Sequence, residues 1–416
     1  FIIGLLLCSY TWADGSRYAS NSLLSEGKWV KIRVDKTGIY KLSYADLKNM
    51  GFSDPSKVSV HGYGGWPLDE DFSKEYIDDV PSTPVWRGSD YLLFYGKGSV
   101  KWEYDSSSQT FVHTNNPYSL YGYYFVTDAT PTNDMTSVAQ ASGASTRITT
   151  YDDYLLHEQE LVSVNQSGRE FFGEDFSGAR PRTISTFSSI PGITDADGKV
   201  TMRFISRINS GSGTASLSIN DSELLDITIP SIQTVSSNVR SYTKAIPGTT
   251  TALWKGSKSE KNNVVVSYSS SGHTNVRLDY IRMQFVRTLR PYGACTFFRS
   301  LTSVGNASRF VISEANSNTL VFDVTDALNV KRVEADLNGS ELSFTIPAGR
   351  LREFVLVQTN QTFPSPEVVG EVASSNLHGL EQRDMIIISA PSLVQQAERL
   401  AVAHREKDGL TVEVVT

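Results

Sequence analysis

The side chains best suited to nucleophilic or metal chemistry are few and widely spaced in this sequence. They are six histidines and two cysteines: His61, His113, His157, His273, His378, His404, Cys8 and Cys295. None falls in an HxxxH or CxxC arrangement, so the sequence gives no support for a zinc site. No potential base lies near Cys295, and we interpret this residue as half-buried packing and not as a thiol nucleophile.

Two of the histidines fall in segments with a recognisable pattern. His61 ends an expected strand beside Gly62, where a packing or turn role is favoured over catalysis. His404 lies on or near the apolar face of an expected helix. We therefore interpret it as a partly buried helix residue and not as a base.

The acidic groups give no clear metal site. Asp195, Asp197 and Gly198 match the start of a calcium loop, but the later ligands of that motif are missing, which favours a β-turn. The clusters Asp69-Glu70-Asp71 and Asp78-Asp79 are interpreted as solvated surface. The sequence also contains no glycine-rich phosphate loop and no serine elbow. We predict no catalytic, cofactor-binding or metal-binding residue in this chain.

Composition limits the class of protein. The 416 residues carry 38 Lys and Arg against 45 Asp and Glu, a net charge of -7 that disfavours binding to nucleic acid. The 39% hydrophobic content suits large folded cores, and the abundance of Tyr and Phe favours strands. No apolar run approaches the roughly 18 residues that a membrane-spanning helix needs. Length alone predicts two to three domains.

The beginning of the sequence is typical of an export signal. The apolar run Phe1–Cys8 is followed by small and polar residues, so we predict a signal peptide at residues 1–13 that lacks its basic start and ends at Ala13. A buried first strand is the alternative, and lipidation at Cys8 is a weaker one because Leu7 precedes it. Removal of the signal would leave Cys295 as the single thiol, without an internal disulfide.

Residues 14–150 are predicted to form an aromatic-rich N-terminal β domain. Trp29–Val34 alternates apolar and charged residues, and a turn separates it from Ile39–Leu42, so the two runs are expected to form a hairpin. A short helix follows, with Ser43 as N-cap and Gly51 as C-cap. The polar residues 128–150 are expected to be a linker or a long loop.

The middle of the chain is predicted to be a β-sandwich at residues 151–300, then a small β domain or linker region at 301–375. The expected sandwich strands alternate polar and apolar residues at 200–206, 214–219, 224–229, 263–269 and 277–286. Because no helix separates them, we expect antiparallel pairing.

The pattern changes in residues 376–416. Met385–Ser389 is a continuous apolar run, typical of a strand buried on both faces of a parallel sheet. Apolar residues then recur at helical spacing, with Ser392 and Gln395 as a possible capping box and Gly409 as a C-cap. A further strand is expected at 410–415. The predicted fold class is therefore mainly β: antiparallel β-sandwich domains followed by the first βαβ unit of an α/β domain.

Several segments, in a consistent order along nearly the whole chain, resemble the sortases of the type IX secretion system of Bacteroidetes. These sortases are gingipain-type cysteine peptidases. The segments are Gly27–Val34, Thr37–Leu42, Val58–Gly65, His113–Tyr118, Gly168–Glu174, Asn376–Gly379, Ala397–Leu400 and His404–Leu410.

The resemblance implies a role in secretion. Members of the family remove the C-terminal sorting domain of secreted cargo at the outer membrane and pass the cargo to anionic lipopolysaccharide. The implied partners are therefore outer-membrane components of the attachment complex, cargo C-terminal domains and lipopolysaccharide as acyl acceptor. The unit at residues 376–416 would be the first part of a gingipain/caspase-like domain. The family's catalytic His and Cys lie later than Thr416, so residues 1–416 are expected to be an inactive β scaffold of the parent enzyme.

Two other interpretations remain open. Aromatic side chains could stack on sugars in a non-enzymatic surface adhesin or glycan-binding β protein, although the βαβ segment weighs against this. Alternatively, the β region could be the pro-segment of a gingipain-like secreted protease.

Overall fold

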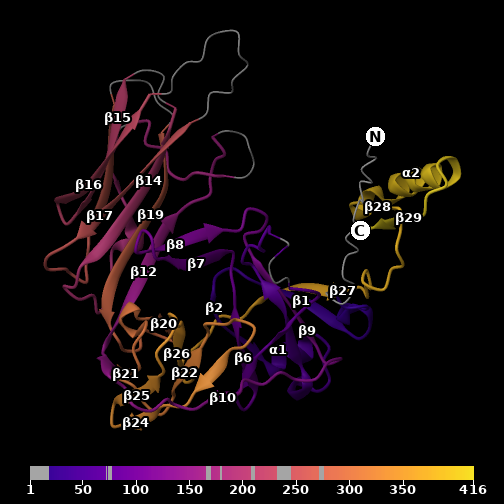
Figure 1. Cartoon of the computed structure of the whole chain (residues 1–416), viewed down its shortest axis with the longest axis horizontal. Coiled ribbons are helices and arrows are strands. Elements are labelled where there is room, and N and C mark those ends of the chain that lie inside the picture. Colours follow the sequence, from indigo (N-terminus) through magenta and orange to yellow (C-terminus); the bar gives the residue numbers. More distant parts are fainter. Residues whose placement is uncertain are drawn as a thin grey trace, which may run out of the picture.

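The computed structural model describes residues 18–71, 73, 77–164, 170–178, 180–207, 211–231, 245–270 and 276–416. The predicted signal peptide and His273 lie outside these residues. Strands dominate the described chain, and most of their pairs are antiparallel. Figure 1 shows the β units gathered together, with a small α/β unit at one end of the molecule. The predicted fold class is confirmed.

The first unit consists of two sheets packed against each other, with strand orders β27-β1-β9-β3-β4 and β2-β6-β5. Its strands are β1 (Trp29–Val34), β2 (Gly38–Ser43), β3 (Ser59–Gly64), β4 (Ser82–Thr83), β5 (Val85–Arg87), β6 (Tyr91–Gly96), β9 (Gly122–Thr127) and β27 (Glu367–Val372). The separate hairpin of β7 (Val100–Asp105) and β8 (Thr110–Asn115) extends from this unit.

The predicted hairpin between the first two strands is wrong. β1 pairs with β9 and β27, whereas β2 pairs with β6 in the opposite sheet. Ile32 of β1 and Leu42 of β2 meet in one buried core between the sheets. Alternation shows which face of a strand is buried, and a chain that crosses from one sheet to the other satisfies the same pattern as a hairpin.

The short helix is confirmed. In α1 (Tyr44–Asn49) the Ser43 hydroxyl accepts the Asp46 N–H at 3.0 Å, and the Asp46 carboxylate accepts the Ser43 N–H at 3.2 Å. This reciprocal capping box satisfies two backbone donors that the helix itself leaves unpaired. Gly51 follows the helix with φ 91°, a conformation that favours glycine.

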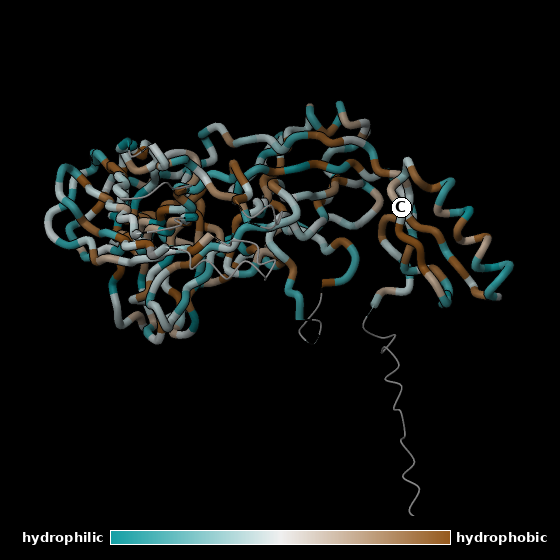
Figure 2. The backbone as a smooth tube through the Cα atoms, turned by 90° about the horizontal axis from the view of Figure 1, so that it is seen from above, coloured by the Kyte–Doolittle hydropathy of each residue, from teal (hydrophilic) through white to brown (hydrophobic). Residues whose placement is uncertain are grey.

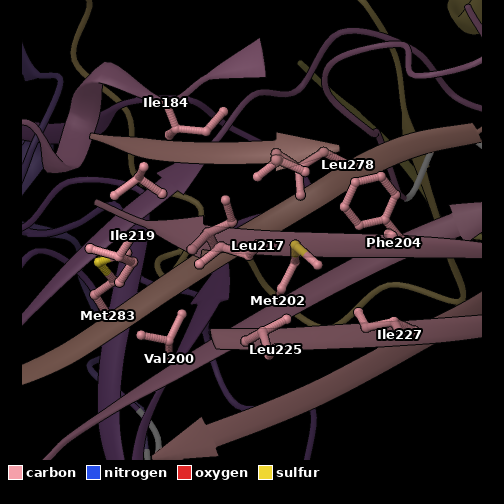
Figure 3. Close-up of a cluster of buried hydrophobic side chains, with 14 of the residues drawn as sticks. Ile184, Val200, Met202, Phe204, Leu217, Ile219, Leu225, Ile227, Leu278 and Met283 are labelled. Carbon is pink, nitrogen blue, oxygen red and sulfur yellow. The ribbon is translucent and has the colours of Figure 1, made fainter. Parts of the chain in front are cut away.

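The second unit is the predicted sandwich, with strand orders β12-β19-β14-β17 and β13-β18-β15-β16. Figure 3 shows apolar side chains of the two sheets pointing toward one another. Its strands are β12 (Thr150–Glu158), β13 (Arg182–Thr183), β14 (Gly198–Ser206), β15 (Ser212–Ile219), β16 (Ser222–Pro230), β17 (Ile246–Trp254), β18 (Val264–Ser270) and β19 (Val276–Thr288).

The third unit also contains two sheets, β10-β23-β22-β26-β20 and β11-β21-β25-β24. Its strands are β10 (Ser137–Val138), β11 (Thr146–Ile148), β20 (Cys295–Phe298), β21 (Ser308–Ile312), β22 (Thr319–Asp323), β23 (Lys331–Val333), β24 (Asp336–Asn338), β25 (Glu341–Ile346) and β26 (Phe354–Gln358). A mixed core joins this unit to the first one, with Ile39 and Leu93 packed with Phe322 and Val355.

Strand pairing crosses the predicted domain boundaries, which remain predictions. The expected linker at 128–150 contains β10 and β11, which pair in parallel with β23 and β21 of the third unit. Similarly, β27 belongs to the region predicted as a small β domain but completes the first sheet beside β1. Local polarity identified these segments as exposed but contained no information on distant pairing partners.

The C-terminal unit is a βαβ arrangement, as predicted. β28 (Met385–Ile388) and β29 (Val412–Val415) pair in parallel, and α2 (Val394–Lys407) connects them. The predicted capping box at Ser392 and Gln395 is wrong, because a 3-10 turn at Pro391–Leu393 moves the N-cap to Leu393, which makes no side-chain cap. Figure 2 shows the apolar residues of this unit concentrated along its strands.

The described part of the chain contains no helix that is both long and apolar enough to cross a membrane.

One buried ion cluster ties the second unit to the third. Arg299 is 1% exposed and follows β20. Its guanidinium donates to both carboxylate oxygens of Glu353, one at 2.5 Å, and to the Asp152 carbonyl of β12 at 2.9 Å. It also lies 4.3 Å from the centre of the Tyr154 ring. A buried guanidinium is tolerated only where such partners replace water.

We expect Arg299→Met to lower the free energy of unfolding by about 3 kcal/mol, since it leaves the Glu353 charge without its partner. The double variant Arg299→Met/Glu353→Leu should lose less free energy of unfolding than Arg299→Met, since it leaves no unpaired charge. Urea denaturation followed by tryptophan fluorescence would measure both losses.

Arg290→Met is the matched control, because the side chains of the Arg290–Glu314 pair at 2.7 Å are 29% and 62% exposed, against 2% and 27% for Arg299 and Glu353. It should cost less than about 1 kcal/mol. Equal losses for Arg299→Met and Arg290→Met would contradict a structural role for the buried cluster.

Candidate functional site

The main candidate site is a cleft with a cavity volume of about 2080 Å³. It lies where the first unit, the β7–β8 hairpin, the sandwich and the segment before the α/β unit meet. The residues that carry its polar chemistry are Asp69, Glu70, Asp78, Asp79, Lys101, Glu103, His113, Asn115, Glu158, Glu160, Glu170, Arg203, Asp279, Tyr280 and His378. We call it the acidic cleft, because carboxylates predominate among these side chains.

Four carboxylates lie on the sandwich side of the cleft, and Arg203 pairs with two of them. Glu158 ends β12, Glu160 and Glu170 lie in the loop that follows, and Asp279 projects from β19. Arg203 of β14 donates to the Asp279 carboxylate and lies 3.6 Å from Glu170. Asp279 is only 4% exposed. Arg282 of β19 adds a second positive charge near Glu158. Four carboxylates thus face two arginines on this side of the cleft.

Burial raises the pKa of Asp279 to about 6; the nearby Glu158 and Glu170 add to this effect, and Arg203 opposes it. A carboxylate away from water and beside like charges loses stability in its ionised form. Asp279 therefore titrates closer to neutrality than an exposed aspartate does.

The β7–β8 hairpin contributes the facing polar groups. His113 Nε2 lies 3.2 Å from Glu158 Oε2, and the two side chains are 5% and 10% exposed. Asn115 donates from Nδ2 to Glu160 Oε1 at 3.0 Å. The other polar atoms of these side chains, His113 Nδ1 and Asn115 Oδ1, are buried and have no hydrogen-bond partner among the described residues.

The β7–β8 hairpin is fixed to the sandwich by the Gln284 side chain, whose amide makes the two hydrogen bonds that a neighbouring strand would make with its backbone. Gln284 of β19 accepts the Phe111 N–H at 2.9 Å and donates to the Phe111 carbonyl at 3.2 Å. The Trp102 ring stacks on Tyr154 of β12 with centroids 4.0 Å apart. These contacts hold the two walls of the cleft at a defined separation.

The acidic residues of the 69–79 segment agree only in part with the prediction that they form solvated surface. Asp69 to Asp71 are exposed, as expected, but Asp78 and Asp79 are half-buried. The Asp79 carboxylate accepts the Ser22 hydroxyl at 2.7 Å and the Leu23 N–H at 2.6 Å, and Asp78 accepts the Ala19 N–H at 2.6 Å. The interpretation of this pair as solvated surface is wrong, because both carboxylates anchor the N-terminal segment.

The same N-terminal segment fastens the connection to the α/β unit. Asn376 Oδ1 accepts the Ser22 N–H at 2.9 Å, its Nδ2 donates to Asn21 at 2.8 Å, and Ser375 N–H donates to Leu24 at 3.0 Å. His378 Nε2 lies 3.6 Å from Asp78. The chain leading to β28 is therefore held against the first unit beside the cleft.

The structure places His61, His157 and His404 in packing or capping positions. His61 is 3% exposed; its ring nitrogens lie 2.8 Å from the Thr130 hydroxyl and 3.1 Å from the Val80 carbonyl, and burial lowers its pKa. His157 contacts Thr186 and Glu174, both at 2.8 Å. His404 Nδ1 pairs with Asp408 at 2.6 Å on the surface of α2.

Cys295 behaves as a packing residue. It lies half-buried against the core shared by the first and third units, and burial raises the pKa of its thiol to about 12. A nucleophilic cysteine requires a thiolate at neutral pH, which burial disfavours here. Figure 1 shows β20, which begins at Cys295, far from α2 and its His404.

The backbone bends at Asp195 and Ala196, and Lys258 packs against this bend. The Asp195 carboxylate accepts the Lys258 N–H at 2.8 Å, and Lys258 Nζ donates to the Ala196 carbonyl at 2.8 Å. The ammonium thus occupies the oxygen-lined position that a cation would need. No group of three or more His, Cys, Asp or Glu that could hold a metal ion occurs among the described residues.

The fold and cleft define a class: a multidomain β protein whose sheets and sandwich precede an α/β unit. Over 96% of its length this chain matches the crystal structure of dimeric latent PorU from Porphyromonas gingivalis, with a TM-score of 0.85 and 34% identity. The chain is therefore PorU-like, and it spans 38% of the length of that protein.

Other comparisons add no functional argument. A carbohydrate-binding module of LamC from Zobellia galactanivorans (12% identity, 32% of this chain and 98% of the module) has a TM-score of 0.18. A module of Cellvibrio japonicus Abf62 (13% identity, 33% of this chain and 97% of the module) has a TM-score of 0.16. Both scores are too low to support an inference. No protein-family model and no protein with a curated description matches the chain.

The raised pKa of Asp279 predicts a specific pH effect on stability. Its value of about 6 in the folded protein exceeds the roughly 3.9 of an unfolded chain, so folding takes up a proton between these values. The contribution of this group to stability therefore rises as the pH falls. In urea denaturation, the free energy of unfolding of the wild type, measured relative to Asp279→Asn, should rise by about 1 kcal/mol from pH 8 to pH 5.

Asp226→Asn provides the control, because Asp226 is exposed on the outer face of the same sandwich. It should show the wild-type pH dependence. If Asp279→Asn also retained the wild-type pH dependence, the proposed burial cost of the Asp279 carboxylate would be refuted.

The Cys295 thiol should react slowly in the native protein. In a Cys8→Ser background, where Cys295 is the single thiol, we expect modification by a disulfide reagent at pH 8 to be on the order of 100-fold slower in buffer than in urea. Absorbance of the released thiol would follow the reaction. A Cys295→Ser variant is the blank, and equal rates in the two solvents would exclude a protected thiol.

Proposed function

We propose that this chain is the non-catalytic β scaffold of a type IX secretion sortase. In this proposal the parent protein is an exported cysteine-type endopeptidase and transpeptidase at the outer membrane. It removes the C-terminal sorting domain of secreted cargo and attaches the cargo to anionic lipopolysaccharide. The observation that carries the proposal is the match to PorU over 96% of this chain.

The C-terminal unit supports the scaffold role. The α/β unit follows a segment that Asn21, Ser22 and Leu24 hold through Ser375 and Asn376. Such anchoring restricts the orientations available to the unit. In addition, Ile386 and Ile388 of β28 are 58% and 83% exposed, which leaves an apolar sheet face that suits contact with further layers of an α/β domain.

The chemistry of the described residues supports an inactive scaffold. Peptide cleavage by a cysteine peptidase requires a thiolate next to a base. The only cysteine among the described residues, Cys295, is held as a protonated thiol, and it begins β20, far from the helix that carries His404 (Figure 1). We therefore assign peptide cleavage to the parent enzyme and positioning to this chain.

Incubation with cargo tests this division of labour. We expect the purified 416-residue chain to leave intact a fusion protein that carries a type IX C-terminal sorting domain, as judged by mass spectrometry. Outer membranes from a bacterium with active type IX secretion are the positive control and should cleave the fusion. Cleavage by the purified chain that persists in its Cys295→Ser variant would disprove the scaffold assignment; cleavage lost in that variant would identify Cys295 as a nucleophile and disprove it equally.

A further inference from the structure

We propose that the acidic cleft binds an extended polypeptide segment in which lysine or arginine side chains stand beside apolar ones. This inference concerns a ligand of the β units themselves and goes beyond the scaffold role. It holds whether or not the parent protein cleaves cargo, because it depends only on the walls of the cleft.

The size of the cleft indicates an extended ligand. Its volume of about 2080 Å³ exceeds the roughly 300–1,000 Å³ that sites for small molecules usually enclose. Its lining comes from the first unit, the β7–β8 hairpin, the sandwich and the segment at His378. A ligand that contacts all these parts must span several residues of a polypeptide or a polymer of similar length.

The negative charge of the cleft favours a cationic ligand. Among the described residues, nine carboxylate residues line it, against one lysine and one arginine. Asp78 and Asp79 are engaged by the N-terminal segment. The four carboxylates of the sandwich side have two arginines near them: Arg203 beside Asp279 and Glu170, and Arg282 near Glu158. An ammonium or guanidinium group would relieve this repulsion, whereas a neutral sugar would leave it in place.

The hydrogen bonds of the hairpin leave room for further donors to the carboxylates. His113 Nε2 lies 3.2 Å from the Glu158 carboxylate, and Asn115 Nδ2 donates to Glu160 Oε1. A carboxylate has two oxygens and accepts several hydrogen bonds, so one such contact does not saturate it. Lysine and arginine side chains supply only donors, which suits them to the remaining positions.

The rim of the cleft adds an apolar component. Leu68, Tyr118, Leu120 and Phe171 line it and are 54%, 86%, 68% and 38% exposed. Apolar side chains grouped around a polar cleft are typical of a protein-interaction site. A segment that alternates cationic and apolar residues would contact the carboxylates and the rim together.

A peptide-binding measurement tests the proposal. The probe is a fluorescent peptide of repeated Gly-Lys-Leu triplets, and fluorescence anisotropy at low and physiological salt reports its binding to the full chain. We expect saturable binding that weakens with salt, and much weaker binding of a matched peptide of Gly-Glu-Leu triplets. Glu160→Lys/Glu170→Lys should weaken binding of the lysine peptide by about tenfold or more. Both residues are exposed, so the fold should tolerate these changes.

The matched control is Glu223→Lys/Asp226→Lys, which changes the net charge equally at two exposed residues of β16, outside the cleft. It should bind the lysine peptide like the wild type. Tyr118→Ser should weaken binding without altering its salt dependence. Equal weakening by both lysine pairs, equal binding of the glutamate peptide, or displacement of the lysine peptide by neutral glucan oligosaccharides would each overturn the proposal.

Discussion

The arrangement of the β units depends on the burial of one guanidinium group. Arg299 follows β20 of the third unit, yet its partners include the Asp152 carbonyl and the Tyr154 ring of β12 in the sandwich. Burial of a charge is tolerated only if every lost contact with water is replaced, so these segments must meet in a single geometry. Since β12 ends at Glu158, the orientation that Arg299 imposes on this strand also determines where the carboxylates of the cleft lie.

Local patterns in the sequence predict the elements of this fold well and their partners poorly. The alternation in β14 to β19 gives strands and buried faces, because each strand packs one face on the sandwich core. The same pattern in β1 and β2 gave a false hairpin, since a crossing between two sheets buries alternate residues in the same way. The pairing of β27 with β1 joins residues more than 330 positions apart, and local sequence does not encode such a register.

The cleft could not be predicted because its chemistry is assembled from segments that are distant in sequence. His113, Glu158 and Asp279 are each unremarkable beside their neighbours in the chain, and none belongs to a motif. The sequence did contain one signal, a hairpin strand with polar residues at His113 and Asn115 followed by the exposed Tyr118. Single-residue interpretations succeeded where the environment is local, as for the helix N-cap at Ser43, and failed for Asp79, whose partners lie 56 and 57 residues away.

The carboxylates of the acidic cleft that would bind a cationic ligand also lower the stability of the folded protein. Burial and two neighbouring glutamates disfavour the ionised form of Asp279, and its pairing with Arg203 offsets only part of this cost. A bound cation changes this balance, because it stabilises the ionised carboxylates and lowers their pKa values. Ionisation of Asp279 and cation binding must then favour one another to the same extent, by thermodynamic linkage. Repulsion among the carboxylates lowers the stability of the fold at neutral pH when no ligand is bound. A cationic segment that binds removes this repulsion, and the free energy so released contributes to its affinity.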